Sequence, residues 1–88
     1  MDEGSRALDA EAPEFDCCVD AVGLLCPEPL MIVRNRVREM AAGEVVRIVA
    51  TDPSTERDFT NFCRFMGHAL IERRVADGRF EFWIRKGG

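Results

Sequence analysis

The hydrophobic pattern of the chain predicts two strands that are each followed by a helix, and then a β-hairpin. Apolar and polar side chains alternate over two short segments, as they do in half-buried strands. After each segment, apolar residues recur every three or four positions, which is the spacing of an amphipathic helix. The predicted elements are strands at residues 15–20 and 45–50, helices at residues 27–41 and 55–67, and a hairpin at residues 69–85 with its turn at Ala76-Asp77-Gly78-Arg79.

The same pattern predicts which side chains form the core. The expected core-facing residues are Phe15, Cys17, Val19, Leu30, Val33, Val37, Met40, Val46, Ile48, Ala50, Phe59, Phe62, Cys63, Met66, Phe80, Phe82 and Ile84. Trp83 alternates with the last of these, so we expect it to cover the open face of the sheet or to contact a partner. Thr55 and Asp58 have the spacing of a capping box at the start of the second helix.

The element order βαβαββ predicts the fold class. Strands separated by a helix pair in parallel through right-handed crossovers, and the hairpin adds antiparallel pairing. Two helices are enough to cover only one face of so small a sheet. We therefore predict an α/β (α+β) two-layer sandwich, with a four-stranded mixed sheet and two helices on one face.

Charge divides the chain into an acidic leader and a folded domain. Residues 1–18 contain six acidic residues and one arginine (net −5), whereas residues 19–88 contain ten acidic and eleven basic residues (net +1). Residues 1–14 bury too little apolar surface to order themselves, so we predict a disordered leader before a domain at residues 15–88. No signal-peptide pattern or apolar run of about 18 residues is present, which predicts a cytoplasmic protein with reduced cysteines and no membrane contact.

Cys26 is the strongest candidate for chemistry. It precedes Pro27-Glu28-Pro29 at the predicted start of a helix, where unsatisfied backbone N–H groups and the helix dipole favour a thiolate. The two prolines stiffen the backbone and remove two of the N–H donors, while the charge of Glu28 opposes the anion. The structural alternative is a cysteine that is buried or that only caps the helix.

The surroundings of Cys26 in the sequence favour a carrier over a catalyst. Acyl transfer needs a base beside the thiol, and the single histidine, His68, is distant in sequence. A dithiol oxidoreductase would have a second cysteine where Pro29 stands. No zinc-ligand spacing is present, and we expect no metal and no cofactor. Among the other cysteines, Cys63 is expected in the core, and Cys17 and Cys18 receive no role.

The segment Asp20-Ala21-Val22-Gly23-Leu24-Leu25-Cys26-Pro27-Glu28-Pro29 resembles the Cys-Pro-x-Pro signature of the TusA (SirA-like) family of sulfur carriers. Further landmarks follow in the expected order, so that the resemblance spans residues 15–88. These landmarks are Asp52-Pro53, Arg57-Asp58, Phe62-Cys63-x-Phe65-Met66-x-His68 and Ile84-Arg85-Lys86-Gly87-Gly88.

The resemblance implies a carrier that receives persulfide sulfur on Cys26 from a cysteine desulfurase of the IscS type. It implies onward transfer through relay proteins of the TusBCD and TusE type to the 2-thiouridine at the tRNA wobble position, with proteins of molybdenum-cofactor maturation as further acceptors. Such a protein is a sulfurtransferase-type carrier and not a stand-alone catalyst. Arg34 and Arg38, with Glu28, are candidates for partner contact because they lie beside or along the first helix.

Two other functions stay open at the level of the sequence. One is an RNA-binding or protein-interaction module, although the nearly neutral domain does not favour direct binding of nucleic acid. The other is a carrier that uses a thiocarboxylate on Gly87-Gly88. Such carriers place two strands before their first helix and this chain places one, so we interpret the Gly-Gly segment as a frayed tail.

Overall fold

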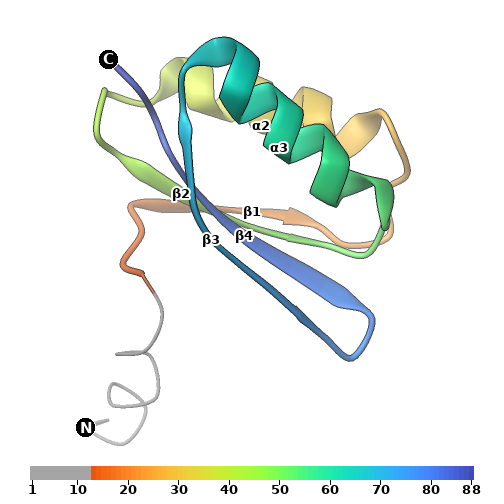
Figure 1. Cartoon of the computed structure of the whole chain (residues 1–88). Coiled ribbons are helices and arrows are strands. Elements are labelled where there is room, and N and C mark those ends of the chain that lie inside the picture. Colours follow the sequence, from red (N-terminus) through yellow and green to blue (C-terminus); the bar gives the residue numbers. More distant parts are fainter. Residues whose placement is uncertain (1–12) are drawn as a thin grey trace, which may run out of the picture.

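The structure is a computed structural model that describes residues 13–88, and most of the predicted leader lies outside the described residues. Its elements follow the predicted order βαβαββ (Figure 1). They are β1 (Cys17–Ala21), α2 (Glu28–Glu39), β2 (Val45–Ala50), α3 (Ser54–Met66), β3 (Ala69–Ala76) and β4 (Arg79–Arg85). The described part of the chain therefore has the predicted elements, with ends that differ by at most two residues.

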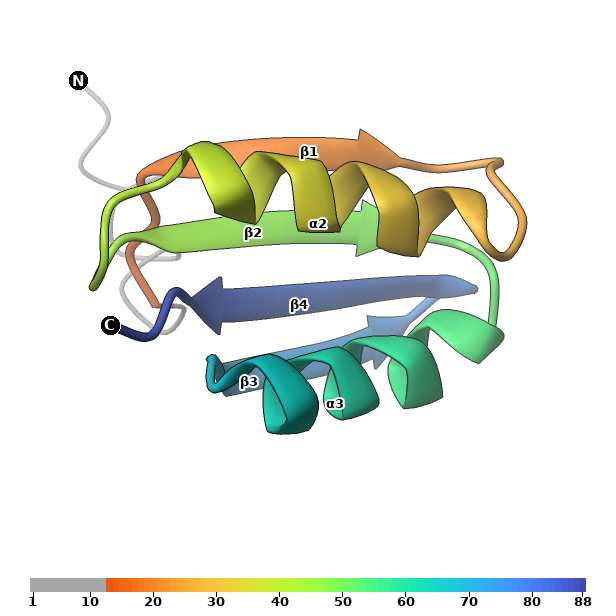
Figure 2. The same ribbon diagram turned by 90° about the horizontal axis from the view of Figure 1, so that it is seen from above.

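The four strands form one mixed sheet in the order β1-β2-β4-β3. β1 and β2 are parallel, whereas β4 is antiparallel to both β2 and β3. Both helices lie on the same face of this sheet, with α2 over β1 and β2 and α3 over β4 and β3 (Figure 2). The predicted two-layer sandwich is confirmed.

The core lies between the sheet and the two helices. Leu30, Val33 and Val37 of α2, with Met40 just after it, pack toward the sheet as the helical spacing predicted. Val46, Ile48 and Ala50 of β2 do so as well. Phe59 of α3 is fully buried and meets the edge of Phe82 from β4, with 4.8 Å between the ring centroids. The prediction for Met66 is wrong, because its side chain is 58% exposed near the end of α3.

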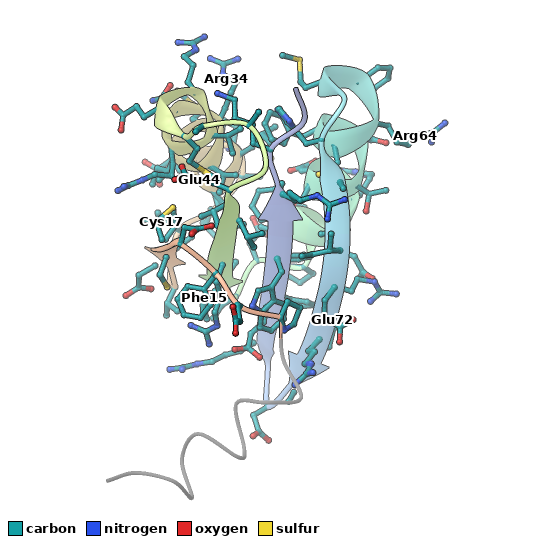
Figure 3. The ribbon with its side chains drawn as sticks, turned by 90° about the vertical axis from the view of Figure 1, so that its left-hand side faces the viewer. Phe15, Cys17, Arg34, Glu44, Arg64 and Glu72 are labelled. Carbon is teal, nitrogen blue, oxygen red and sulfur yellow. The ribbon has the colours of Figure 1, made fainter. Side chains whose placement is uncertain are left out.

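Alternation predicted that Phe15 faces the core together with Cys17 and Val19. The structure places Phe15 elsewhere. Asp16 interrupts the strand, since its N–H donates to the carbonyl of Val45 and its carboxylate accepts the N–H of Val45. Phe15 lies instead beside the guanidinium of Arg47, which is 5.8 Å from the ring centroid. Figure 3 shows the Phe15 ring beside the sheet. The sheet therefore begins at Cys17, two residues later than predicted.

Trp83 is on the sheet face away from the helices, as predicted, and it is buried there. The guanidinium groups of Arg47 and Arg74 lie 5.8 Å and 5.5 Å from its ring. Arg47 also forms an ion pair with Glu81 on β4. Cation–π contacts and the apolar stems of the arginines cover the indole. Of the two predicted roles of Trp83, the structure shows the first, in which its side chain covers the open face of the sheet.

The tail after β4 is fixed, so the prediction of a frayed Gly-Gly segment is wrong for Gly87. The N–H of Lys86 donates to the carbonyl of Glu44, and the N–H of Gly87 donates to Nδ1 of His68 at 2.9 Å. A Cβ atom on Gly87 would lie 1.9 Å from the carbonyl oxygen of Gly67. Only glycine permits this close approach of the two backbone segments.

His68 makes the stability of this tail dependent on pH. Burial, together with the charge of Lys86, lowers the pKa of His68 from its ordinary value of 6.5. The unfolded chain therefore binds a proton at a higher pH than the folded chain does. The contribution of neutral His68 is complete above about pH 6.5 and is lost as the pH falls through the lowered folded value.

We expect the free energy of unfolding to decrease from pH 7.5 to pH 5, and the part due to His68 to disappear in His68→Gln. Urea unfolding of both proteins at several pH values measures this difference, and NMR titration follows the single histidine directly. Identical pH dependence in the two proteins would contradict the assigned role of the Gly87–His68 hydrogen bond.

Candidate functional site

The site lies where the carboxyl ends of two parallel strands meet. Ala21 at the end of β1 pairs with Ala50 at the end of β2, so the loops that follow them emerge at the same edge of the sheet. One loop contains Cys26 and the other contains Asp52 (Figure 2). In open α/β sheets, ligands bind outside the carboxyl ends of the strands.

Hydrogen bonds from the second loop fix the first. Gly23, with φ of 83°, donates its N–H to Oγ1 of Thr51 at 2.9 Å. The carboxylate of Asp52 accepts the N–H of Cys26 at 2.7 Å and that of Ser54 at 3.0 Å. These bonds from Ser54 and Cys26 lower the pKa of Asp52, because they stabilise its charged form. Asp52 therefore holds the loop of Cys26 against the start of α3.

Asp58 is the side-chain partner of the Cys26 sulfur. The thiol donates to Oδ2 of Asp58 with a sulfur–oxygen distance of 3.5 Å. The predicted capping box is therefore wrong, since Asp58 faces Cys26 and Thr55 donates its hydroxyl to the carbonyl of Asp52. Two carboxylates from the β2–α3 region thus contact Cys26, one at its backbone and one at its sulfur.

Cys26 does not cap α2. The N-cap is Pro27, without a side-chain cap, and the Cys26–Pro27 peptide bond is cis. The N–H of Glu28 donates to the carbonyl of Leu25 at 2.9 Å, so it is not available to the sulfur. The sequence placed the thiol next to the helix correctly, but among the described residues no N–H group of α2 donates a hydrogen bond to the sulfur.

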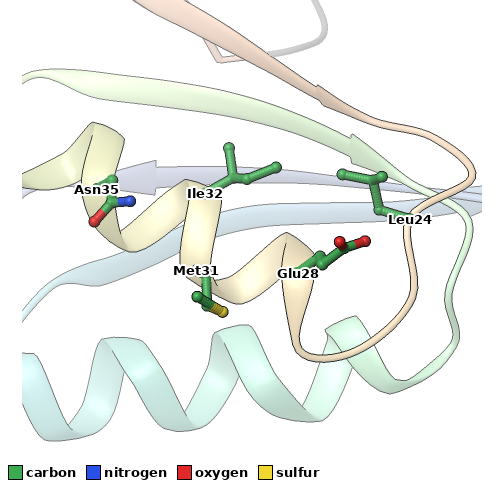
Figure 4. Close-up of a pocket in the computed structure, with 5 residues that line it drawn as sticks. All are labelled: Leu24, Glu28, Met31, Ile32 and Asn35. Carbon is green, nitrogen blue, oxygen red and sulfur yellow. The ribbon is translucent and has the colours of Figure 1, made fainter.

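Exposed apolar side chains lie close to Cys26 in the sequence. Cys26 is exposed, and its neighbour Leu25 is 69% exposed. A groove of about 250 Å³ runs along α2, which we call the α2 groove (Figure 4). Its lining consists of Leu24, Glu28, Met31, Ile32 and Asn35. Exposed apolar side chains on the helix that follows an exposed thiol are typical of a surface that contacts another protein.

A second groove, which we call the interhelical groove, lies between α2 and α3 and has a volume of about 370 Å³. Its lining consists of Leu30, Arg34, Asp58, Asn61, Phe62, Phe65 and Met66. Phe65 is 83% exposed at its edge. Because Asp58 contacts the Cys26 sulfur, the groove leads to the thiol.

The candidate site residues are distributed around Cys26 and along α2. Glu28 lines the α2 groove beside the first turn, and Pro29 is buried beneath it. Arg34 lines the interhelical groove. Arg38 lies farther along α2, in a pocket of about 180 Å³ shared with His68. Arg34 and Arg38 thus lie on the side of α2 that faces α3, whereas Glu28 lines the other groove.

The other cysteines and the histidine have different surroundings. Cys63 is in the core, and burial raises the pKa of its thiol to about 11. Cys17 is half-buried, and burial raises the pKa of its thiol also. Cys18 is exposed beside Arg47 on β2. His68 accepts the hydrogen bond from Gly87, and residues 13–88 contain no group of His, Cys, Asp and Glu that is suited to hold a metal ion.

Sequence reasoning missed the roles of Asp52 and Asp58 as partners of Cys26. Both were landmarks of the family resemblance, but Asp58 was interpreted as part of a capping box and Asp52 received no role, so neither was expected to contact a residue 32 or 26 residues back along the chain. The available signal was the position of Asp52 directly after a strand that pairs in parallel with the strand before Cys26.

Comparison with known proteins identifies the family of the chain. The family model described as Sulfurtransferase TusA matches residues 18–86. The chain belongs to the TusA family. Proteins named Sulfur carrier protein TusA from Pseudomonas paraeruginosa PA7 and Pseudomonas syringae pv. syringae B728a are each 49% identical to it over 71 residues. These matches cover 81% of this chain and 90% and 84% of the two relatives.

A solved structure agrees with this membership of the TusA family. The crystal structure of a SirA-like protein from Desulfitobacterium hafniense superposes with a TM-score of 0.74 at 25% sequence identity. The match covers 83% of this chain and all of that chain. In residues 13–88 of this TusA-family protein, no helix is long and apolar enough to cross a membrane.

Replacing Asp52 with alanine tests how the TusA-family loop is held. We expect several-fold faster amide hydrogen exchange at Cys26 and Ser54, because both N–H groups lose their acceptor. Asp52→Asn retains one side-chain oxygen and should lie between wild type and Asp52→Ala. Exchange measured by NMR at these two amides decides the point, and unchanged exchange in Asp52→Ala would contradict it.

Proposed function

We propose that this protein accepts persulfide sulfur on Cys26 from a cysteine desulfurase and passes it to the thiol of an acceptor protein. The observation that carries the proposal is the exposed sulfur of Cys26 on a hydrogen-bonded loop, with a carboxylate as its side-chain partner. A thiol that receives and releases sulfur needs access by a partner more than it needs a neighbouring base. Membership of the TusA family of sulfur carriers supports this chemistry.

The surface around Cys26 supports transfer between docked proteins. The grooves are lined largely by apolar side chains, and Arg34 offers a guanidinium to an acidic group on a partner. Arg38 extends the positive charge along the same helix. Pro27 and Pro29 limit movement of the backbone beside the thiol. Exposed apolar area of this kind brings two sulfurs together without an enclosed substrate pocket.

We further propose a cytoplasmic relay with a desulfurase of the IscS type as donor and proteins of the TusBCD and TusE type as acceptors. Its product is 2-thiouridine at the wobble position of tRNA, and proteins of molybdenum-cofactor maturation are further acceptors. The 49% identity to named TusA carriers supports this assignment. The carrier needs no cofactor, because the sulfur is covalent cargo.

The test is incubation of the full chain with a cysteine desulfurase and cysteine, followed by mass spectrometry of its peptides. We expect one added sulfur atom on the peptide of Cys26, removable by a reducing thiol. No added sulfur on Cys26 would overturn the proposal. Loading that requires Gly87-Gly88 would favour the thiocarboxylate carrier, and salt-sensitive RNA binding without loading would favour a nucleic-acid module.

The tRNA step needs a separate test in cells. A bacterial strain without its own carrier of this family should regain 2-thiouridine when it expresses this chain, as measured by mass spectrometry of digested tRNA. Loading of Cys26 in vitro without restored 2-thiouridine would keep the carrier chemistry and overturn the proposed acceptor.

A further inference from the structure

The electrostatic environment of Cys26 differs from that of an activated thiol. Reactive cysteines usually lie beside a cation or a helix N-terminus, which stabilise the thiolate. The sulfur of Cys26 lies 3.5 Å from a carboxylate oxygen of Asp58, and Pro27 is the N-cap in its place. In this contact the S–H group donates and the carboxylate accepts. The sulfur therefore has a carboxylate beside it, and not a cation or a helix terminus.

The charge of Asp58 is only partly compensated. Its side chain is 17% exposed, so solvent screens it incompletely. The nearest cation is Nε of Arg57, 3.7 Å from Oδ1, and the Arg57 side chain is 75% exposed. An ion pair at such an exposed position contributes little. A negative charge on the Cys26 sulfur would therefore lie next to the negative charge of the Asp58 carboxylate.

We propose that Asp58 is a positioning residue that makes Cys26 retain its sulfur until a partner docks. The proposal rests on the proposed function of Cys26 as a sulfur carrier. The carboxylate orients the unloaded thiol through the S–H hydrogen bond, and it opposes every state in which Sγ itself is a thiolate.

The loaded protein experiences a weaker repulsion. In the persulfide anion the charge is on the terminal sulfur, about 2.05 Å farther along the S–S bond than Sγ. During discharge, an acceptor thiolate attacks that terminal sulfur, and the new S–S bond forms as the bond to Sγ breaks. Sγ leaves with the electron pair as a thiolate and then takes the proton that the acceptor thiol released. Asp58 makes this leaving group less favourable, which retards discharge.

The interhelical groove gives a partner access to this control. Asp58 lines the groove together with Arg34 and Phe65. A cationic side chain of the acceptor placed in the groove would neutralise Asp58 when the two sulfurs meet. Transfer to an undocked small thiol would lack this help. Asp58 thus favours discharge to a docked acceptor protein over discharge to free thiols.

The test compares Asp58→Asn with the control Asp77→Asn. The control removes one negative charge at the hairpin turn, where asparagine also tolerates the positive φ of 54°. Both proteins and the wild type are treated with iodoacetamide, and the Cys26 peptide is quantified by mass spectrometry. At pH 7 and low salt we expect alkylation of Cys26 to be about threefold faster in Asp58→Asn and unchanged in the control.

The dependence of the alkylation rate on salt and pH shows whether Asp58→Asn acts by removing a charge or by loosening the loop of Cys26. The difference in alkylation rate between Asp58→Asn and wild type should shrink at about 1 M salt, where the Debye length is about 3 Å. It should also shrink at about pH 10.5, where thiols are ionised. Equal rates for wild type and Asp58→Asn would overturn the proposal. A faster rate in Asp58→Asn that does not respond to salt or pH would also overturn it, because only loop mobility would then have changed.

Discharge of the loaded protein completes the test. Persulfide on Cys26, loaded by the desulfurase, should transfer to a small thiol about threefold faster in Asp58→Asn than in wild type at low salt. Equal discharge rates would overturn the retention of sulfur by Asp58. Failure to load Cys26 in any of the proteins would overturn the carrier function itself, whereas the alkylation result does not depend on loading.

Discussion

Replacing Cys26 with serine is expected to abolish accumulation of transferable sulfur on the protein. Serine has nearly the same shape and can keep the hydrogen bond to Asp58, but its oxygen cannot form the S–S bond of a persulfide. Labelled sulfur from cysteine, transferred by a cysteine desulfurase and followed through non-reducing gels, measures the loss. The free energy of unfolding should change little, since the side chain is exposed.

Two control variants separate this result from general loss of thiols. Cys18→Ser removes another exposed thiol and Cys63→Ser removes the buried one, and each should leave loading of Cys26 intact. Serine in the core at Cys63 also lowers stability, so loading is compared at a temperature where all variants are folded. Retained loading in Cys26→Ser, with loss in Cys18→Ser, would move the carrier site to the open face of the sheet.

Replacing Phe59 with alanine is expected to cause the largest loss of stability, about 3–5 kcal/mol in the free energy of unfolding. Phe59 is fully buried, and its ring meets the edge of Phe82 on β4 at 4.8 Å between centroids. Truncation removes this contact and leaves a cavity under α3. Small domains are stable by only about 5–15 kcal/mol, so the loss is a large fraction of the total.

The effect of Phe59→Ala should extend to the site. Asp58 is the adjacent residue on α3, and its position beside Cys26 depends on how α3 packs on the sheet. Urea unfolding measures the stability loss, and NMR shifts at Cys26 report on the site. Phe65→Ala removes a ring of the same type that is 83% exposed on the same helix, and it should cost less than about 0.5 kcal/mol. Similar losses in the two variants would contradict the assignment of Phe59 to the core.

Most of the fold was predictable because local sequence patterns determine its strands, helices and turns. The strand at Val45–Ala50 and the hairpin turn at Asp77-Gly78 were predicted well, since alternation and a two-residue turn with positive φ are local properties. Phe15 was placed on the wrong face because its neighbour Asp16 bonds to β2, a contact between distant segments. The tail at Gly87 was predicted to fray because its hydrogen bond depends on His68, which precedes it by 19 residues.

The sequence allowed one residue of the candidate site, Cys26, to be predicted, but not the residues that contact it. Cys26 was identified from the Cys-Pro-x-Pro segment and from the absence of other chemistry near it in the sequence. Its expected support by N–H groups of α2 was wrong, because the chain turns at Pro27 and the N–H of Glu28 bonds to Leu25. The actual partners, Asp52 and Asp58, become neighbours only when β1 and β2 pair.

The sequence by itself determined the order of elements, the inward-facing stripes and the identity of the candidate thiol, because periodicity and residue type act over a few residues. The tertiary structure decided what touches that thiol. Parallel pairing of β1 with β2 brings Asp52 to its backbone, and packing of α3 brings Asp58 to its sulfur. Contacts between segments 26 and 32 residues apart arise from packing of the whole domain, so no local pattern around Cys26 encodes them.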